Sequence, residues 1–359
     1  MTNPAFGRFF LPGPTDVHQD VLAAMQRPMI GHRSSAMEQL LGGIAPQLGR
    51  LFRTSRPVLV GTASATGFME MAVRNGVARR ALSLVNGAFS ARFADLVGAA
   101  GKECIRLEVP LGSAVEPAML RDALRRTPVD AVTLVHSETS TGVLQDVEAL
   151  AAVVHEFDDC LVLVDAVTSL AGSPVEPDRW GLDFTFTGSQ KALALPPGLA
   201  LGVASERMLA RAKTLHGRGL YFDLVSFEEA TRKFQPTNTP ALSLLYALEI
   251  QLGRIERVGG VEARWQRHDA MRRRVEAWSE PHGVRLVPPE GRRSWTVSCL
   301  QMPEGKNPRE IVGGLKQQGW TIGDGYGALK DKTIRIGHMG DHTPAGLDEL
   351  LALLAQMLE

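Results

Sequence analysis

The feature that most constrains the fold is an alternation, between Pro57 and Ala204, of short apolar runs with segments of helical periodicity. The apolar runs are uniformly hydrophobic, which is typical of strands buried on both faces of a sheet. Helical segments that follow such runs supply the crossover connections of a parallel sheet. The runs expected to form strands are 58–60, 81–85, 131–135, 161–164, 184–186 and 199–204. We therefore predict an α/β fold with a mostly parallel sheet between helices.

Helices with apolar residues at helical spacing are expected elsewhere in the chain as well. The expected helices are 16–25, 35–52, one reaching about residue 80, one reaching 100, 146–156, 242–257 and 261–280, with a loop at 216–227. After Gly259-Gly260 the pattern changes to strand 295–302, helix 308–318, strand 333–336 and helix 343–357, which predicts a small α+β domain. The expected organisation is an N-terminal arm (1–20), a large domain (21–258) and a smaller C-terminal domain (259–359).

Charge and cysteine content exclude several classes of function. The 359-residue chain has a formal net charge of zero, so long-range attraction to nucleic acid or an anionic membrane is not expected. Cys104, Cys160 and Cys299 lie far apart without a CxxC pair, which argues against a disulfide framework or a zinc site. The N-terminus lacks the regions of a signal peptide, and the longest uncharged apolar run, 192–204, is too short to span a bilayer. We expect a soluble, cytoplasmic protein.

Small and polar residues follow several predicted strands, at the edge where parallel sheets bind ligands. Residues 61–67 lead into a helix, where backbone N–H groups and hydroxyls can hold a phosphate, although a simple Ser/Thr helix cap is the plainer alternative. The segment 86–92 offers the aromatic face of Phe89, and a polar cluster occupies 136–142. Asp165 ends an apolar strand with a carboxylate, which suits a ligand contact or the cap of a turn.

Lys191 follows the predicted strand 184–186 and has no charged neighbour between Asp183 and Glu206. Pro196, Pro197 and Gly198 come soon after, so no long helix can carry the lysine outward. A partly buried amine has a lowered pKa and can attack a carbonyl to form an imine. The alternative is an ordinary lysine at the end of a strand.

Two further motifs have the residue spacing of a functional site but not the structural context that such a site requires. The segment 323–328 has the glycine spacing of a dinucleotide site but does not lead into a helix, and we interpret it as a turn. His338 and His342 have metal-like spacing, but Gly340 and Pro344 break any helix that would align the two imidazoles. No metal site is predicted.

A phosphate cradle, an aromatic plate, a carboxylate and a buried lysine are together what pyridoxal 5′-phosphate (PLP) requires. Its aldehyde forms an imine, its phosphate needs N–H and O–H donors, and its ring stacks on an aromatic side chain. Its pyridine nitrogen needs an anion to stay protonated, so that the ring can accept electrons from a carbanion.

With these residues identified, the sequence resembles the class V aminotransferases of PLP fold type I, and within them the alanine–glyoxylate / serine–pyruvate aminotransferase branch. The resemblance spans nearly the whole chain. The motifs that carry it are 12–14, 31–32, 138–145, 165–167, 188–198 and 335–340. It implies a mostly parallel, seven-stranded type of sheet and a smaller C-terminal α+β domain.

The resemblance also implies roles for individual residues. Lys191 would form the imine and then move the proton, and Asp165 would hold the pyridine nitrogen. Arg335 would bind the substrate α-carboxylate, for which a planar guanidinium is suited, and Gly13 would lie beside the substrate. The other implied cofactor contacts are Ser64, Ala65, Thr66, Phe89, Thr139, Val167, Gln190 and, from the second subunit of a homodimer, Thr239. Gln235-Pro236 stands where relatives have a tyrosine, which puts part of that inter-subunit contact in doubt.

The implied activity is a ping-pong transfer of an amino group from alanine or serine to glyoxylate or pyruvate. Two alternatives remain within the fold: an aspartate- or 2-aminoethylphosphonate-type aminotransferase, and a catalytically silent binding protein. A cysteine desulfurase is disfavoured, because its cysteine lies on a mobile loop whereas Cys299 lies inside a predicted strand.

Overall fold

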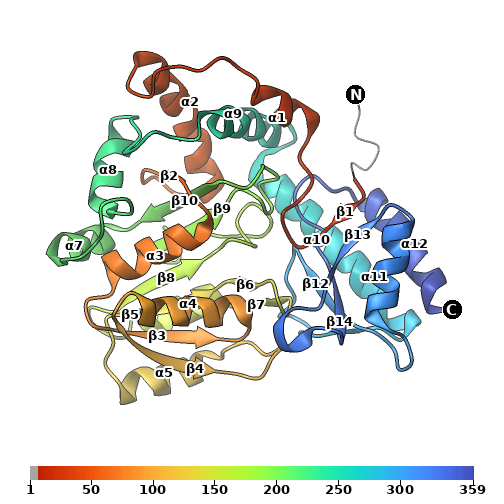
Figure 1. Ribbon diagram of the computed structural model, residues 1–359. Coiled ribbons are helices and arrows are strands. Elements are labelled where there is room, and N and C mark those ends of the chain that lie inside the picture. Colours follow the sequence, from red (N-terminus) through yellow and green to blue (C-terminus); the bar gives the residue numbers. More distant parts are fainter. Residues whose placement is uncertain (1–6) are drawn as a thin grey trace.

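The computed structural model describes residues 7–359, and the larger part of it is a seven-stranded sheet with helices on both faces (Figure 1). The strand order is β2-β10-β9-β8-β5-β3-β4. Strand β10 is antiparallel to both of its neighbours, and the remaining pairings are parallel, which confirms the mostly parallel sheet. The strands are β2 (Leu59–Thr62), β3 (Arg80–Val85), β4 (Glu103–Glu108), β5 (Ala131–Val135), β8 (Leu161–Asp165), β9 (Phe184–Gly188) and β10 (Leu199–Ala204).

The central strands bury side chains on both faces, as their uniform hydrophobicity predicts. In β8, Leu161 and Leu163 join one hydrophobic cluster, whereas Val162 and Val164 join another on the opposite face. The period of two follows from the pleat of the strand. Because helices cover both faces, ligands can reach the sheet only at its edges or beyond its strand ends.

The helices fall into groups that match these clusters. One face of the sheet is covered by α3 (Ala65–Gly76), α4 (Ala88–Ala99), α7 (Glu206–Thr214) and α8 (Leu224–Arg232). The other face is covered by α2 (Ser35–Phe52), α5 (Pro117–Arg126), α6 (Val147–Val154) and α9 (Leu242–Arg257), with the short α1 (Gln19–Ala24) packed on α9. A two-stranded ribbon, β6 (Ser137–Glu138) and β7 (Val143–Leu144), lies beyond the end of β5.

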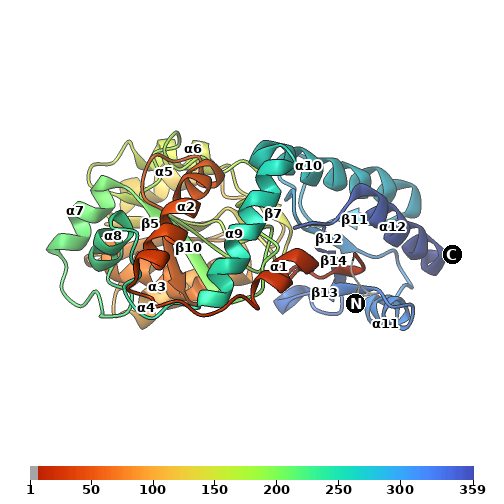
Figure 2. The same cartoon turned by 90° about the horizontal axis from the view of Figure 1, so that it is seen from above.

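The smaller part is a five-stranded sheet of order β1-β13-β14-β12-β11, which lies beside the larger part in both views (Figures 1 and 2). Its strands are β1 (Phe9–Phe10), β11 (Arg285–Leu286), β12 (Ser298–Gln301), β13 (Thr321–Asp324) and β14 (Thr333–Ile336). Helices α10 (Gly260–Ser279), α11 (Pro308–Gln317) and α12 (Pro344–Leu358) pack on it. The N-terminal segment thus joins the C-terminal sheet through β1, which pairs with β13. The domain boundary expected at Gly259-Gly260 stays a prediction.

Several local predictions were wrong or incomplete. The loop expected at 216–227 contains the start of α8 at Leu224, and the turn expected at 323–328 begins inside β13, which ends at Asp324. Strand β4 was missed because it is an edge strand that carries charged residues between apolar ones, so no uniform apolar run marks it. The strand expected at 295–302 is shorter in the structure, where β12 covers Ser298–Gln301.

Candidate active site

A cavity of about 500 Å³ lies beyond the carboxyl ends of the parallel strands. Segments that follow β2, β3, β5, β8 and β9 all reach it, as the chain order of a parallel sheet predicts. The lining includes ten of the twelve residues proposed from the sequence: Gly13, Ser64, Ala65, Thr66, Phe89, Thr139, Asp165, Val167, Gln190 and Lys191. Residues far apart in the chain are therefore brought to one concave surface.

Lys191 lies in a tight turn after β9, and Ser189 fixes this turn. The Ser189 hydroxyl donates to the Pro196 carbonyl at 2.8 Å and accepts from the Leu199 N–H at 3.2 Å. The lysine is only 8% exposed, and its Nζ donates a hydrogen bond to the Pro12 carbonyl oxygen. Burial and then the nearby charge of Arg335 lower the pKa of Lys191 to about 8. The amine is thus neutral more often than an exposed lysine would be.

Asp165 ends β8 and is 4% exposed. Its Oδ1 accepts a hydrogen bond from the Val167 N–H at 2.8 Å, which turns the chain and places Val167 on the cavity wall. Burial raises the pKa of Asp165 to about 7, against the Val167 hydrogen bond and the charges of Lys191 and Arg92. A cationic partner placed against this carboxylate would favour its ionised form.

The small and hydroxylic segment after β2 forms the start of helix α3. Ser64 occupies the N-cap position, but its side chain makes no capping hydrogen bond. The plainer interpretation of this serine as a simple cap is therefore not supported, and its hydroxyl is available to a ligand. The backbone N–H groups at a helix N-terminus favour an anion. Thr66 and Gln190 also line the cavity and add polar groups to it.

Phe89 is held in place through the backbone of the first turn of α4. The buried carboxylate of Glu138 accepts hydrogen bonds from the Phe89 N–H at 3.1 Å and from the Ser90 N–H at 2.9 Å. A Cβ at Gly87 would lie 2.4 Å from Glu138 Cγ, so the carboxylate can approach this closely only because residue 87 is glycine. An anion at a helix N-terminus is favourable. Glu138, on β6, thus fixes the position of Phe89, whose N–H group it binds.

Thr139 and Arg335 connect the cavity to the smaller sheet. The Thr139 hydroxyl is hydrogen-bonded to the Thr168 hydroxyl at 2.6 Å. Arg335, on β14, is 9% exposed and donates from Nη1 to the Thr139 carbonyl at 3.2 Å and from Nε to the Asp324 carbonyl at 2.8 Å. Arg335 therefore contacts a residue of the cavity wall, although it is not itself part of the lining.

Thr239 does not reach this cavity. It is an exposed residue in the segment before α9, and its neighbour Ala241 donates from its N–H to the Thr62 hydroxyl at 2.8 Å. The structure thus brings together ten proposed residues, places Arg335 beside them, and leaves Thr239 on the surface of the same chain.

Three residues near the cavity were not assigned a role from the sequence: Arg92, Glu138 and Tyr326. Arg92 lines the cavity, and its Cζ lies 5.1 Å from the centre of the Phe89 ring. The i, i+3 spacing of these two residues on a predicted helix was a usable signal. The stacking of Tyr326 on Phe89 had no such signal, since the two residues lie in different parts of the chain.

The motifs that were set aside make structural contacts. His338 Nε2 is hydrogen-bonded to the Ser298 hydroxyl at 2.9 Å, and His342 Nε2 to the Phe9 carbonyl at 3.0 Å. Within residues 7–359, no group of three or more His, Cys, Asp or Glu side chains is arranged to hold a metal ion. None of the helices in this range combines the length and the apolar character that crossing a membrane requires.

Comparisons with known proteins agree with this site. The model of the family described as "Aminotransferase class-V" matches residues 100–338. An uncharacterized aminotransferase of Methanocaldococcus jannaschii is 37% identical, over 96% of this chain and 90% of that protein. The serine–glyoxylate aminotransferase of Methylorubrum extorquens is 31% identical, over 94% and 87% of the two chains.

A solved structure gives the same result for the fold. The alanine–glyoxylate aminotransferase of Nostoc sp. superposes with a TM-score of 0.93, covering 100% of this chain and 97% of that one at 29% sequence identity. From the family model and from relatives that match nearly the full chain, this protein belongs to the class-V aminotransferase family and is a transaminase.

Proposed function

We propose that this chain is a PLP-dependent aminotransferase that moves an amino group from alanine or serine to glyoxylate or pyruvate in a ping-pong cycle. The observation that carries the proposal is that Lys191 and Asp165, one with a lowered and one with a raised pKa, line the same cavity. Pairs of titratable groups perturbed in this way cluster at catalytic sites. The relatives named serine–glyoxylate and alanine–glyoxylate aminotransferases support the choice of substrates.

The residues that line the cavity fit PLP. The N-terminus of α3, where the Ser64 hydroxyl makes no capping hydrogen bond, suits a phosphate. Phe89 offers an aromatic face to a planar ring. Burial raises the pKa of Asp165, and the protonated ring nitrogen of PLP would be a cation that favours its ionised form. When bound, PLP supplies an electron sink for the bond-breaking at the substrate α-carbon.

Each side chain would then have a defined task. Lys191 Nζ, whose pKa is lowered by burial, would take the proton from the substrate Cα and deliver it to the cofactor carbon. The Asp165 carboxylate would accept a hydrogen bond from the protonated ring nitrogen and keep that nitrogen charged. Nε and one N–H of Arg335 are engaged with backbone carbonyls, so its remaining N–H groups are available to a substrate carboxylate.

A cysteine desulfurase is further disfavoured by the environment of Cys299. This residue lies in β12 with no exposed surface, and burial raises the pKa of its thiol to about 11. A thiol in this state is a poor nucleophile at neutral pH. A silent binding protein is disfavoured because the lysine, the aspartate and the cavity are all present together.

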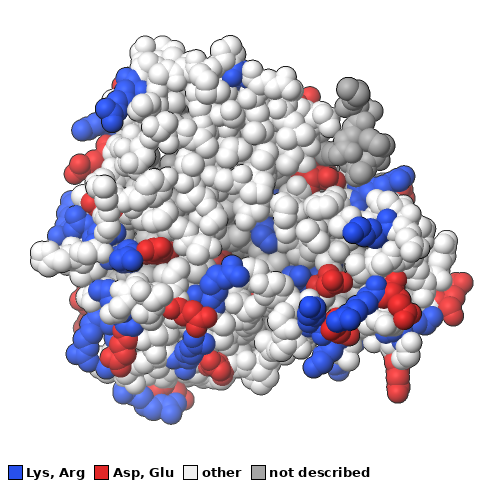
Figure 3. Space-filling model, in the orientation of Figure 1, with Lys and Arg blue, Asp and Glu red and all other residues white. Residues whose placement is uncertain are grey.

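We also propose that the protein is a homodimer whose partner subunit completes the site. Thr239, expected to contact the cofactor of the other subunit, is exposed and lies outside its own chain's cavity. Figure 3 shows few charged side chains over the region of α2 and α9, in contrast to the lower half of the same face. The exposed fractions of Met29 (67%), Leu220 (95%), Tyr221 (42%) and Phe234 (44%) are high for such side chains.

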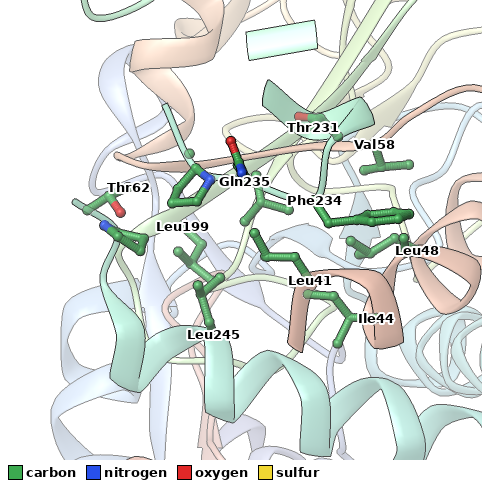
Figure 4. A pocket seen from close by; sticks show the side chains of 15 residues that line it. Leu41, Ile44, Leu48, Val58, Thr62, Leu199, Thr231, Phe234, Gln235 and Leu245 are labelled. Carbon is green, nitrogen blue, oxygen red and sulfur yellow. The ribbon is translucent and has the colours of Figure 1, made fainter. Parts of the chain in front are cut away.

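A small apolar cavity of about 50 Å³ lies under this region, between α2, β2 and the segment before α9. In Figure 4 the ring of Phe234 lies between the side chains of Val58 and Leu48. Gln235 and Pro236, which replace the expected tyrosine, line the same cavity. An apolar surface around Thr239 is suited to burial against a second copy.

Mixing two inactive variants tests the shared site. A Lys191→Ala chain and a Thr239→Asp chain are each expected to be inactive. Subunit exchange between them would place Thr239 of the first chain opposite Lys191 of the second and restore about a quarter of the wild-type activity. No recovery in dimers that are shown to have exchanged would mean that Thr239 does not serve the partner's site.

The activity itself is tested by a half-reaction screen. The PLP-loaded protein is mixed with single amino acids, and the visible absorbance of the cofactor and the released keto acid are measured. We expect alanine and serine to react fastest, ahead of aspartate and 2-aminoethylphosphonate, and the Lys191→Ala variant to release no keto acid. Faster reaction with either of the latter two donors would replace the proposed substrates.

A further inference from the structure

Tyr326 lies where the two candidate binding groups of the site meet. It precedes a short 3₁₀ turn, Gly327–Leu329, in the connection from β13 to β14. Its ring is stacked on that of Phe89, with centres 5.5 Å apart and planes inclined by 21°. The Cζ of Arg335 lies 5.3 Å from the centre of the same ring. One aromatic ring therefore contacts both the proposed ring-stacking residue and the proposed carboxylate-binding residue.

The position of this ring is set by the backbone around it. Gly325 donates from its N–H to the Thr333 carbonyl at 2.9 Å, and Leu329 donates to the Tyr326 carbonyl at 3.1 Å. A Cβ at residue 325 would lie 2.0 Å from the Leu329 carbonyl oxygen, so this closed turn requires glycine. Tyr326 is 39% exposed and is not a residue of the hydrophobic core. Filling the core is therefore not what accounts for its placement.

The contact between the Tyr326 ring and Arg335 leaves the remaining N–H groups of the guanidinium free to bind a carboxylate. Two carbonyl oxygens, of Asp324 and Thr139, occupy Nε and one N–H of Nη1. An aromatic ring within about 6 Å of a cation attracts it electrostatically and uses none of its N–H groups. The other N–H groups of Arg335 keep the paired geometry that a carboxylate needs.

The Phe89–Tyr326 pair also lies between two cavities. Phe89 lines the candidate active site, whereas Tyr326 lines a second cavity of about 470 Å³. The second cavity is bounded by the start of α4, the segment after β4, and residues 326–329. The stacked rings thus form part of the wall between the cavities, which places Tyr326 at the boundary of the substrate space.

We propose that Tyr326 is a positioning residue that holds the Arg335 guanidinium in line with the Phe89 plate, and so sets the affinity of the enzyme for the substrate carboxylate. This inference rests on the proposed function, because it takes Arg335 as the carboxylate-binding group. A carboxylate is bound equally in the ground state and in the transition state, so loss of the contact raises KM and leaves kcat nearly unchanged.

Three variants test the proposal. Tyr326→Phe keeps the ring, Tyr326→Leu removes it while filling much of the space, and Lys330→Ala is a matched control at an exposed residue of the same connection. The measurements are the Kd of propionate, an unreactive carboxylate, by calorimetry on the PLP-loaded protein, and KM and kcat for alanine. We expect Tyr326→Leu to raise both Kd and KM by about tenfold, and the other two variants to stay within about twofold of wild type.

Other results would overturn the proposal in identifiable ways. A Tyr326→Leu chain with wild-type Kd and KM would show that the ring does not hold Arg335. Equal damage in Tyr326→Phe would assign the effect to the hydroxyl, and a fall in kcat at unchanged KM would assign it to Phe89. A second aliphatic variant, Tyr326→Met, covers the case in which the leucine chain does not fold. If wild type binds propionate but transaminates no amino acid, the proposed function fails and the positioning role is still measured by Kd.

Discussion

The α-carbon of Gly13 lies directly against the side chain of Lys191: a Cβ on residue 13 would be 2.5 Å from Lys191 Cδ and 2.6 Å from Nζ. The Nζ also donates a hydrogen bond to the carbonyl oxygen of Pro12. The N-terminal segment therefore covers one side of the lysine, although Gly13 precedes the first strand of the large sheet and Lys191 follows β9. This contact explains why the buried amine is held toward the cavity.

Gly13→Ala is expected to abolish most of the activity. The new methyl group overlaps the lysine, and the φ of +106° at residue 13 is strained for any residue with a Cβ. We expect kcat/KM to fall on the order of 10²-fold, since a displacement of about 1 Å at a catalytic group has this effect. Steady-state kinetics on the PLP-loaded protein measures it.

Gly98→Ala is the matched control for that variant. Gly98 lies in α4, and a Cβ there meets no atom within 4 Å. Alanine should stabilise the exposed helix by about 0.5–1 kcal/mol and leave the kinetics unchanged. Equal kinetic losses in the two glycine variants would contradict the proposed contact.

The rate of PLP uptake by the apoprotein is expected to rise with pH until about pH 8. Burial and the Arg335 charge lower the pKa of Lys191 to about 8, and only the neutral amine reacts. Below this value the rate should rise about tenfold per pH unit, and above it the rate should level off. Rates of a free amine in the same buffers, each divided by the neutral fraction of that amine, report the titration of PLP itself and are used to correct the protein's rates.

Two variants should move this midpoint in opposite directions. The Arg335 charge lowers the pKa of Lys191 and the Asp165 charge raises it. Arg335→Gln should therefore shift the midpoint to higher pH, and Asp165→Asn to lower pH. Shifts in the same direction would mean that Lys191 does not feel these two charges separately.

Asp165→Asn is expected to lower the activity and to reduce the loss of stability that accompanies rising pH. Loss of the anion facing the ring nitrogen should lower kcat on the order of 10²-fold, the usual cost of removing one preorganised electrostatic contact. Burial raises the folded-state pKa of Asp165 to about 7, so the folded apoprotein holds a proton that the unfolded chain releases near pH 4. The stability of the wild-type apoprotein should therefore fall as pH rises from about 4 to 7, and this fall should be smaller in the variant. Chemical denaturation across this pH range measures the difference.

Arg264→Met is expected to destabilise the fold strongly. Arg264, on α10, is 2% exposed, and its guanidinium bonds Asp341 at 2.8 Å and the carbonyl of Ala192, the residue after the lysine, at 3.0 Å. Without Arg264, Asp341 keeps only the more distant Arg254 and Arg267, at 3.6 and 4.0 Å, and the Ala192 carbonyl loses its donor. We expect a cost of about 3 kcal/mol, the lower end of the range for a broken buried pair. Arg274→Met is the control on the same helix, because Arg274 forms an exposed pair with Asp348 and should cost no more than about 1 kcal/mol.

The pH dependence of the Arg264 variant gives an independent check. Burial opposes the ionisation of Asp341, but the charges of Arg264, Arg267 and Arg254 outweigh it and lower the pKa of Asp341 below its usual value. The stability from this pair is present above the unfolded-state pKa near 4 and is lost as pH falls through the lower, folded-state value. The difference between wild type and Arg264→Met should therefore shrink in acid. A constant difference would assign the loss to packing of the arginine stem instead.

The helices and strands with a clear hydrophobic pattern could be predicted from the sequence, because hydrophobic periodicity is local. The structure has β5 at Ala131–Val135, β10 at Leu199–Ala204, α9 at Leu242–Arg257 and β14 at Thr333–Ile336, with the bounds expected from the sequence. Elements with mixed polarity were missed, such as the edge strand β4 and the amphipathic helix α5 (Pro117–Arg126), which has four charged residues beside its two buried leucines. Their apolar residues are too few for the pattern to stand out.

The sequence by itself determined the alternation of strands and helices, and with it the edge of the sheet at which Ser64, Asp165 and Lys191 meet, because parallel strands end on the same side. Only the tertiary structure decided how those residues are held: Glu138 under the backbone of Phe89, Gly13 against Lys191, and Tyr326 between Phe89 and Arg335. Apart from the contact between Tyr326 and Arg335, they join residues tens to hundreds of positions apart. Their geometry depends on how the two sheets pack, and no local pattern of side chains records it.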